Sequence, residues 1–396
     1  MFGRTVLICA AVLYVAIMMG CVISAARSDQ TQPRVAAAVA QPPRPRLDGL
    51  PFRGVGMQIQ RVDWIDQYKQ NIDEITQLGA DTVLLVVDAR QENAGSCRIY
   101  LDMRMTPTPE QLGSLIQHAK SKNLRVILMP IVLLDNPRKD TEWRGTIQPE
   151  AAPAYRNAWE EWFDSYRAMM AHFSWVAQAN GVDVLVVGSE LVSTESKLDQ
   201  WTKTIREIRN TFKGLLTYSA NWDHYVSIPF WDQLDLIAMN SYYKLGEGPK
   251  VTVEQIQKRW AEIQKDQIAF VKKMGKPLLF TEVGWCSLAN AAHEPWDYTR
   301  SEVPIDLDLQ RRLYEGFFRS WHGHPDLGGF MIWEWTCGDG GPKNRGYTPE
   351  GKPAETVLRQ WLAKPRWTVE QRAAAEQRAG RLGHSGASLS GPATPL

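Results

Sequence analysis

The sequence contains little cysteine and almost no excess of either charge. Five cysteines among 396 residues are too few to build a disulfide scaffold. The formal net charge is +1, from 45 Lys and Arg against 44 Asp and Glu, which argues against the marked basic excess that nucleic-acid binding requires. A hydrophobic content of 44% excludes a disordered chain. The composition therefore describes an ordinary globular protein whose partner is not nucleic acid.

Several motifs of enzyme chemistry are also missing. No HExxH motif or cysteine pair is present to bind zinc, and His322 and His324 follow an expected helix. No Gly-x-Gly-x-x-Gly follows the first apolar run, as a dinucleotide-binding fold would need. The Gly-x-Ser-x-Gly elbow of serine hydrolases is absent as well. We therefore expect an activity that uses no metal and no organic cofactor.

The N-terminal segment predicts export. Residues 5–26 carry no charge, follow Arg4 and end in small residues, which is typical of a signal peptide. The run is also long enough to remain as a membrane anchor. A third interpretation uses residues 18–21 (MMGC), which resemble a lipoprotein processing box with Cys21 as the lipidated residue. Residues 1–26 are thus a signal peptide or a membrane or lipid anchor, and each alternative predicts a periplasmic or extracellular protein.

The composition divides the rest of the chain into a linker, one domain and a tail. Residues 27–51 are rich in Pro and Ala, which is typical of an extended tether that could hold a domain near a membrane. Residues 364–396 combine a short solvated helix pattern with a Gly, Ser and Pro-rich end that we expect to be flexible. Between them, residues 52–363 form the one catalytic domain that we expect, and we expect it to be monomeric.

Within that domain, short apolar runs alternate with longer helical patterns. Most runs are continuously apolar, as expected for parallel strands that are covered on both faces. Residues 153–178 and 253–274 show the three- and four-residue spacing of amphipathic helices. Eight strands alternating with helices predict an α/β fold, a (β/α)8 TIM barrel. The eight candidate strands begin near Phe52, Thr82, Leu124, Val182, Leu215, Leu234, Pro277 and Gly328.

The fifth unit of this predicted barrel is the weakest. Only about a dozen residues connect Asn221 to Leu234, too few for a full helix and its two connections. We therefore expect the helix of this unit to be short or missing.

Two glutamates end very apolar strands. Glu190 closes the run VLVVGSE on the fourth strand, and Glu282 closes PLLFTE on the seventh. A carboxylate at the end of a buried strand is costly unless a partner or a reaction uses it. In a TIM barrel, the groups at the carboxyl ends of strands form the active site. The alternative is that both glutamates are structural and bind loop amides or arginines.

Two facing carboxylates are suited to glycoside hydrolysis, in which one protonates the leaving oxygen and the other attacks the anomeric carbon. Trp222, Trp285 and Trp333 also follow predicted strands, and the chain has 16 tryptophans in all. Their flat faces could stack on sugar rings, although a tryptophan rim without any ligand is the alternative. The two glutamates and the three tryptophans together indicate a carbohydrate-active cleft.

Three short motifs carry a family resemblance. The segments GSEL at 188–191, MNSYY at 239–243 and FTEVGW at 280–285 resemble glycoside hydrolase family 113. Its known members include endo-β-1,4-mannanases, and it belongs to clan A of the retaining glycoside hydrolases. The resemblance covers about residues 52–362 and implies a TIM barrel.

The resemblance also implies roles for individual residues. Glu190 would be the general acid/base and Glu282 the nucleophile. Tyr242, or its neighbour Tyr243, would hydrogen-bond the nucleophile, and Trp333 would form the floor of the sugar site.

One position departs from the clan's pattern. Most of the clan has Asn immediately before the acid/base glutamate, whereas this chain has Ser189. The recognition of the sugar 2-hydroxyl would then pass to another amide, and Asn240 or Asn221 could supply it.

These observations predict a retaining β-glycoside hydrolase that acts on a β-linked polysaccharide or oligosaccharide such as β-1,4-mannan. The alternatives are a catalytically inactive glycan-binding barrel of the cell envelope and a hydrolase specific for β-glucan. Cys286 and Cys337 follow neighbouring strands, so an oxidised pair and two free thiols are both compatible with the sequence.

Overall fold

The computed structural model describes residues 47, 49–152, 157–365, 374 and 377. The predicted export segment, almost all of the linker and most of the tail lie outside the described residues, so these expectations stay predictions. Within the described part of the chain, no helix has the length and apolar character needed to cross a membrane.

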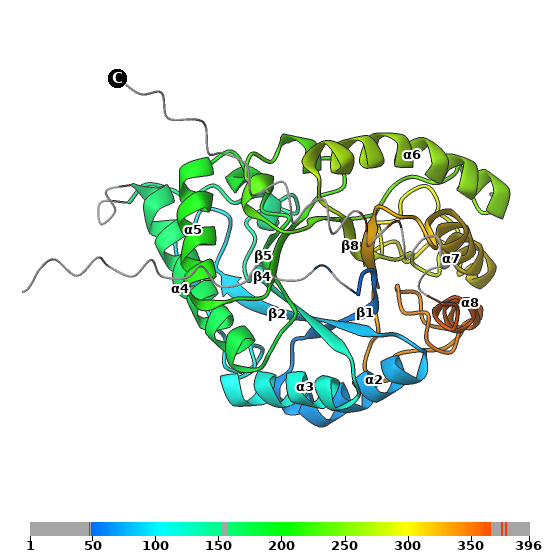
Figure 1. The fold of residues 1–396 in the computed structure, drawn as a ribbon, viewed down its shortest axis with the longest axis horizontal. Coiled ribbons are helices and arrows are strands. Elements are labelled where there is room, and N and C mark those ends of the chain that lie inside the picture. Colours follow the sequence, from blue (N-terminus) through cyan, green and yellow to red (C-terminus); the bar gives the residue numbers. More distant parts are fainter. Residues whose placement is uncertain (1–46, 48, 153–156, 366–373, 375–376, 378–396) are drawn as a thin grey trace, which may run out of the picture. The chain divides into compact units, whose positions relative to one another are not determined.

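A closed barrel of eight parallel strands forms the centre of the domain (Figure 1). The barrel closes because β1 pairs in parallel with both β2 and the last strand, β9. The two-residue β3 (Ile99–Tyr100) adds an antiparallel extension to the end of β2. The predicted (β/α)8 fold is therefore confirmed. The barrel strands are β1 (Phe52–Ile59), β2 (Thr82–Gln91), β4 (Arg125–Leu134), β5 (Val184–Ser189), β6 (Leu215–Ala220), β7 (Ile237–Asn240), β8 (Leu278–Val283) and β9 (Leu327–Ile332).

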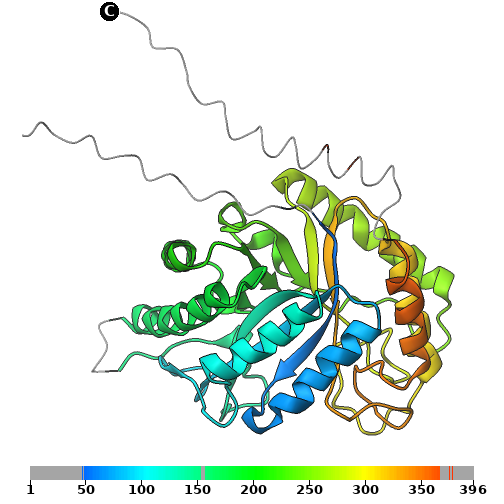
Figure 2. The same ribbon diagram turned by 60° about the horizontal axis from the view of Figure 1, so that its bottom comes forward.

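Helices surround this ring of strands, and Figure 2 shows α2 and α3 running beside each other over β1 and β2. Several begin at caps that the sequence supplies. Thr108 and Gln111 form a capping box before α3, and Thr252 and Gln255 form one before α6. Gly275 ends α6 in the left-handed region, with a φ of 66°. The helices are α2 (Ile65–Gln77), α3 (Pro109–Ser121), α4 (Ala158–Ala179), α5 (Leu198–Thr211), α6 (Val253–Met274), α7 (Leu307–Trp321) and α8 (Pro353–Leu362).

The fifth unit lacks a full helix, as predicted. Two 3₁₀ turns, Tyr225–Ser227 and Trp231–Gln233, connect β6 to β7 in its place. The Lys276 ammonium donates to the carbonyl oxygens of Trp231, Asp232 and Leu234 and so closes the second turn against the start of β8.

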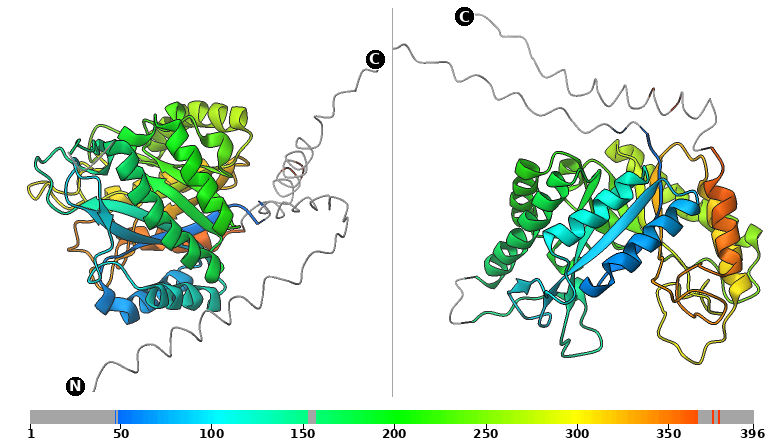
Figure 3. Two further views of the ribbon diagram at one scale, coloured as in Figure 1. Left: turned by 90° about the vertical axis from the view of Figure 1, so that its left-hand side faces the viewer. Right: turned by 90° about the horizontal axis from the view of Figure 1, so that it is seen from below.

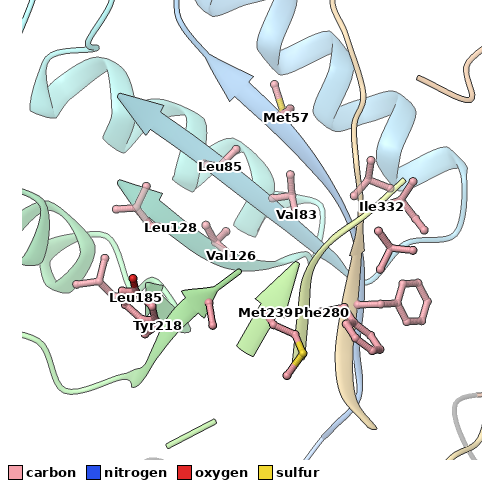
Figure 4. Packing of buried hydrophobic residues seen from close by; sticks show 14 of the residues in the cluster. Met57, Val83, Leu85, Val126, Leu128, Leu185, Tyr218, Met239, Phe280 and Ile332 are labelled. Carbon is pink, nitrogen blue, oxygen red and sulfur yellow. The ribbon is translucent and has the colours of Figure 1, made fainter. Parts of the chain in front are cut away.

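The strands bury side chains on both faces, which explains their continuously apolar sequences. On β2, Val83 and Leu85 pack outward against the helices, whereas Leu84 and Val86 point into the barrel. Figure 4 shows Val83 and Leu85 within the outer layer. Successive side chains of a strand alternate between its faces, so two layers of core result from one apolar run.

Long connections follow the carboxyl ends of several strands, and Figure 3 shows the connections after β8 and β9 gathered at one end of the barrel. In barrels of this class that end carries the active site.

Candidate active site

A cavity of about 840 Å³ opens at the carboxyl ends of the strands. Polar and aromatic side chains from at least six of the eight strands or their loops converge on it, as sites for polar ligands require. The lining residues used below are Gln58, Gln60, Trp143, Arg144, Glu190, Asn221, Trp222, Tyr242, Glu282, Trp296, Tyr298, Trp333 and Glu334.

Glu190 directly follows β5 in an unusual backbone conformation. Its φ is 52°, in the left-handed region that non-glycine residues seldom adopt. The strand pairing is irregular just before it, between Val186 and Ser189. The Glu190 amide donates to the Ser219 carbonyl at 2.9 Å, which ties this turn to β6. Strained residues of this kind cluster at functional sites, where the surrounding structure holds them in place.

Two donors engage the two carboxylate oxygens of Glu190. The Arg144 guanidinium forms an ion pair with Oε2, and the Asn240 amide donates to Oε1. Asn240 also donates to Asn221 Oδ1 at 3.0 Å and accepts from the Trp222 amide at 2.8 Å. Asn240 thereby connects the carboxylate to the loop that follows β6.

Glu282 lies on β8, and its side chain is buried against the cavity. The Tyr242 hydroxyl donates to its Oε2 at 2.6 Å. Burial, and then the negative charge of Glu190, raise the pKa of Glu282, while Arg144 and Tyr242 act in the opposite direction. The two glutamates are thus close enough to interact electrostatically, and the Arg144 guanidinium interacts with both of them.

The neighbouring Tyr243 has a different partner. Its hydroxyl donates to the Trp222 carbonyl at 3.0 Å and accepts from Gln267 at 2.9 Å. Of the two tyrosines named from the sequence, Tyr242 is therefore the one that lies on Glu282.

A third carboxylate, Glu334, also lines the cavity. Gln58 donates to Glu334 Oε2 at 2.7 Å, and Gln60 donates to Gln58 Oε1 at 2.9 Å. Burial raises the pKa of Glu334 to about 7. Gln60, Gln58 and Glu334 thus form a hydrogen-bonded row on β1 and after β9. β9 is the strand next to β8, which carries Glu282.

Aromatic rings form the walls and the floor. Trp222 and Trp296 stack with centroids 6.3 Å apart and planes at 17°. Trp296 is 48% exposed, and Tyr298 and Trp143 are exposed as well. The backbone of Trp333 packs directly against Gly284. A Cβ added to Gly284 would lie 2.1 Å from the Trp333 carbonyl oxygen, so this close contact requires glycine. Exposed rings in a polar cavity are suited to stacking on sugar faces.

Two of the predicted substrate-binding residues do not line this cavity. Trp285 is completely buried and packs edge-on against Tyr314, so the expectation that it contacts the substrate is wrong. Asn240 is also completely buried, and it holds Glu190 instead of facing a ligand. Asn221, the other amide suggested by the sequence, does line the cavity. Ser189 is buried, and its hydroxyl has no hydrogen-bond partner in the described part of the chain.

The described part of the chain contains three cysteines. Cys97, Cys286 and Cys337 are free, so the structure has two separate thiols after β8 and β9. Among the described residues, no group of three or more His, Cys, Asp or Glu side chains could hold a metal ion.

Sequence reasoning missed Arg144 and Trp296. Both lie in long connections, after β4 and after β8, where neither apolar periodicity nor strand ends give a signal. Gln58 lies at the end of β1 and Glu334 shortly follows β9, so strand ends do give a signal for these two residues.

A (β/α)8 barrel with two buried carboxylates at the ends of its fourth and seventh strands, inside an aromatic cleft, has the architecture of a glycoside hydrolase. Comparisons with known proteins agree. The family model described as Glycoside Hydrolase Family 113 matches residues 55–352. The chain belongs to glycoside hydrolase family 113, and it is a glycosidase.

Solved structures support the same assignment. A complex of a family 113 β-1,4-mannanase is 27% identical, with a TM-score of 0.71, over 80% of this chain and 100% of that chain. The family 113 β-mannanase AaManA from Alicyclobacillus acidocaldarius, in complex with ManMIm, is 29% identical, with a TM-score of 0.71, over 80% of this chain and 98% of that chain. The β-glucuronidase of Faecalibacterium prausnitzii shares only the fold. It is 13% identical, with a TM-score of 0.54, over 81% of this chain and 50% of that chain. No curated protein sequence matches the chain significantly.

Proposed function

We propose that this protein hydrolyses β-1,4-mannan with retention of configuration, with Glu190 as general acid/base and Glu282 as nucleophile. The observation that carries the proposal is the pair of cavity carboxylates at the ends of β5 and β8, together with the Tyr242 hydroxyl on Glu282. The mannan substrate is proposed from the two mannanases whose structures resemble this chain.

The reaction takes two steps. In the first, Glu190 transfers a proton to the glycosidic oxygen while Glu282 Oε attacks the anomeric carbon, so the bond to the leaving sugar breaks and a glycosyl ester forms. In the second, Glu190 removes a proton from water, and the water oxygen displaces Glu282 from the anomeric carbon. Tyr242 stabilises the negative charge of Glu282 before attack and after release, because a hydrogen bond to a carboxylate favours its charged form.

The aromatic walls favour a polymer over a small glycoside. Trp296, Tyr298 and Trp143 are exposed and line the same cavity as the carboxylate pair, so further sugar units could stack on them. The long connections that carry them are additional to the barrel itself.

The test uses the full chain with borohydride-reduced mannan and cellulose oligosaccharides, and product chromatography. We expect cleavage of the mannan series and a loss of at least about 1,000-fold in Glu190→Gln and Glu282→Gln, as for other paired catalytic groups. Glu195→Gln is the matched control, because Glu195 is a buried glutamate that does not line the cavity.

Each alternative gives a different result. Cleavage of the cellulose series alone would identify a β-glucan hydrolase, and binding without cleavage would identify an inactive glycan-binding barrel. Proton NMR of the first product tests the stereochemistry, since an initial α-anomer would exclude retention.

We also propose that the protein is exported, on the pattern of residues 1–26. Fractionation of cells that express the full chain tests this, and a product confined to the cytoplasm would refute it.

A further inference from the structure

Glu334, the third carboxylate of the cavity, has no role in the two reaction steps proposed above. It lies in the connection after β9 and lines the same cavity as Glu190 and Glu282. In the described part of the chain, its side chain receives one hydrogen bond, from the neutral amide of Gln58. A carboxylate with so little protein support in a cavity is costly unless a ligand also binds to it.

The backbone on both sides of Glu334 is held by the barrel. The Trp333 amide donates to the Val283 carbonyl on β8 at 2.8 Å, and the Trp335 amide donates to the Gly56 carbonyl on β1 at 2.8 Å. Glu334 is thus fixed between two strands, although it follows β9 in a long connection. A side chain that recognises a substrate needs this kind of rigid support.

The side chain of Glu334 is oriented by two glutamines of β1 and the residues just after it. Gln58 Oε1 accepts from Gln60 at 2.9 Å, so the Gln58 amide nitrogen faces Glu334 and donates to its Oε2 at 2.7 Å. Glu334 Oε1 has no hydrogen-bond partner among the described residues, and it is not enclosed by the protein. This oxygen therefore faces the cavity, where an ionised carboxylate can only accept.

The position of Glu334 places it beside the proposed nucleophile. Its negative charge contributes to the raised pKa of Glu282, so the two carboxylates lie near each other. In the barrel, β9 and β1 lie on one side of β8, and β7 and β6 lie on the other. Glu334 and Asn221, which follows β6, thus approach Glu282 from opposite sides. A sugar whose anomeric carbon meets Glu282 must lie against Glu334.

We propose that Glu334 is a specificity-determining residue that accepts a hydrogen bond from a hydroxyl group of the sugar that Glu282 attacks. The sugar displaces water from this part of the cavity, so a substrate without that hydroxyl leaves the Glu334 carboxylate unpaired. Sites of this kind strongly reject the analogue that lacks the hydroxyl. This inference rests on the proposed function, in which Glu282 is the nucleophile.

The first test compares kcat/KM for 4-nitrophenyl β-mannoside and its 2-, 3-, 4- and 6-deoxy analogues, in the wild type and in Glu334→Met. Methionine fills a similar volume and offers no oxygen. For one analogue, we expect removal of the hydroxyl to cost the wild type at least about tenfold more than it costs Glu334→Met. The intrinsic reactivity of each substrate cancels in this comparison. A purely structural role would slow all five substrates by one factor, and that result overturns the inference.

Two further variants sharpen this test. Glu334→Gln keeps an acceptor oxygen but loses the charge, so its sensitivity to the same analogue should lie between those of the wild type and Glu334→Met. A sensitivity as large as that of the wild type overturns the inference as well. Glu350→Gln is the matched control, because Glu350 lies in the same connection and does not line the cavity. It should respond to every analogue as the wild type does.

A second measurement does not depend on turnover. Calorimetric titration with mannohexaose compares Glu282→Gln with Glu282→Gln/Glu334→Met. We expect binding to be at least about fivefold weaker in the double variant, and equal affinities overturn the inference. If Glu282→Gln instead retains full activity, the proposed mechanism fails, while the deoxy analogues still decide the role of Glu334. If the protein cleaves no glycan, the titration decides it.

Discussion

The hydroxyl of Tyr242 is the contact whose removal gives the sharpest prediction. Tyr242→Phe keeps the ring and deletes one donor, which lies 2.6 Å from Glu282 Oε2. Both side chains are buried, so the deletion removes a hydrogen bond from a largely desolvated carboxylate.

The size of the effect follows from this geometry. A hydrogen bond to a buried charged group contributes about 1.5 to 3 kcal/mol. Losing it from the ionised nucleophile should lower kcat/KM roughly 10- to 150-fold near neutral pH. Because the hydrogen bond lowers the pKa of Glu282, its loss raises that pKa. The acid limb of kcat/KM, which follows ionisation of the nucleophile, should therefore move up by about 1 to 2 pH units.

The assay is the pH dependence of kcat/KM on a mannooligosaccharide, with Tyr243→Phe as the matched control. Tyr243 is the adjacent buried tyrosine, but its hydroxyl bonds the Trp222 carbonyl and Gln267 and no carboxylate. We expect this control to lower stability and leave the acid limb in place. If the acid limb of Tyr242→Phe coincides with that of the wild type, the Tyr242 hydroxyl does not favour the ionised form of Glu282.

Three further predictions concern stability and substrate length. Burial raises the pKa of Glu195 from its ordinary value of 4.5 to about 7, so the folded protein loses stability as the pH rises from about 4.5 through 7. Urea unfolding should show Glu195→Gln more stable than the wild type by up to about 3 kcal/mol at pH 8 and equal to it at pH 4. Gly284→Ala, whose methyl group would meet the Trp333 carbonyl, should cost about 3 kcal/mol or more by the same assay, and unchanged stability would contradict this. Trp296→Ala should raise KM up to about tenfold for long mannooligosaccharides and little for an aryl mannoside, whereas Trp175→Ala, an exposed tryptophan on α4 outside the cavity, should change neither.

Most of the barrel could be predicted from the sequence, because each strand is buried on both faces and therefore reads as a short apolar run. The helix expected at 253–274 has those bounds in the structure, because Thr252 caps its start and Gly275 ends it. The missing helix of the fifth unit was also predictable, since the number of connecting residues limits what can form.

The two carboxylates were predictable for a related reason. The carboxyl ends of parallel strands meet at one end of a barrel, so Glu190 and Glu282 had to lie at the same end. Which way a side chain turns after its strand depends on the loop that follows, and apolar periodicity does not specify this. Trp285 follows β8 closely, yet it turns outward to pack on α7. Arg144 reaches Glu190 from the middle of a long connection, where only the folded backbone brings the two together.

The left-handed backbone of Glu190 also separates what the fold needs from what the proposed reaction needs. At a φ of 52°, glycine would be more stable than glutamate by about 1 kcal/mol or more. The barrel by itself therefore gives no reason for a glutamate at this turn, and a glycine there would serve an inactive glycan-binding barrel better. Only the proposed reaction needs the carboxylate, so the backbone strain at this position is a cost of turnover and not of folding.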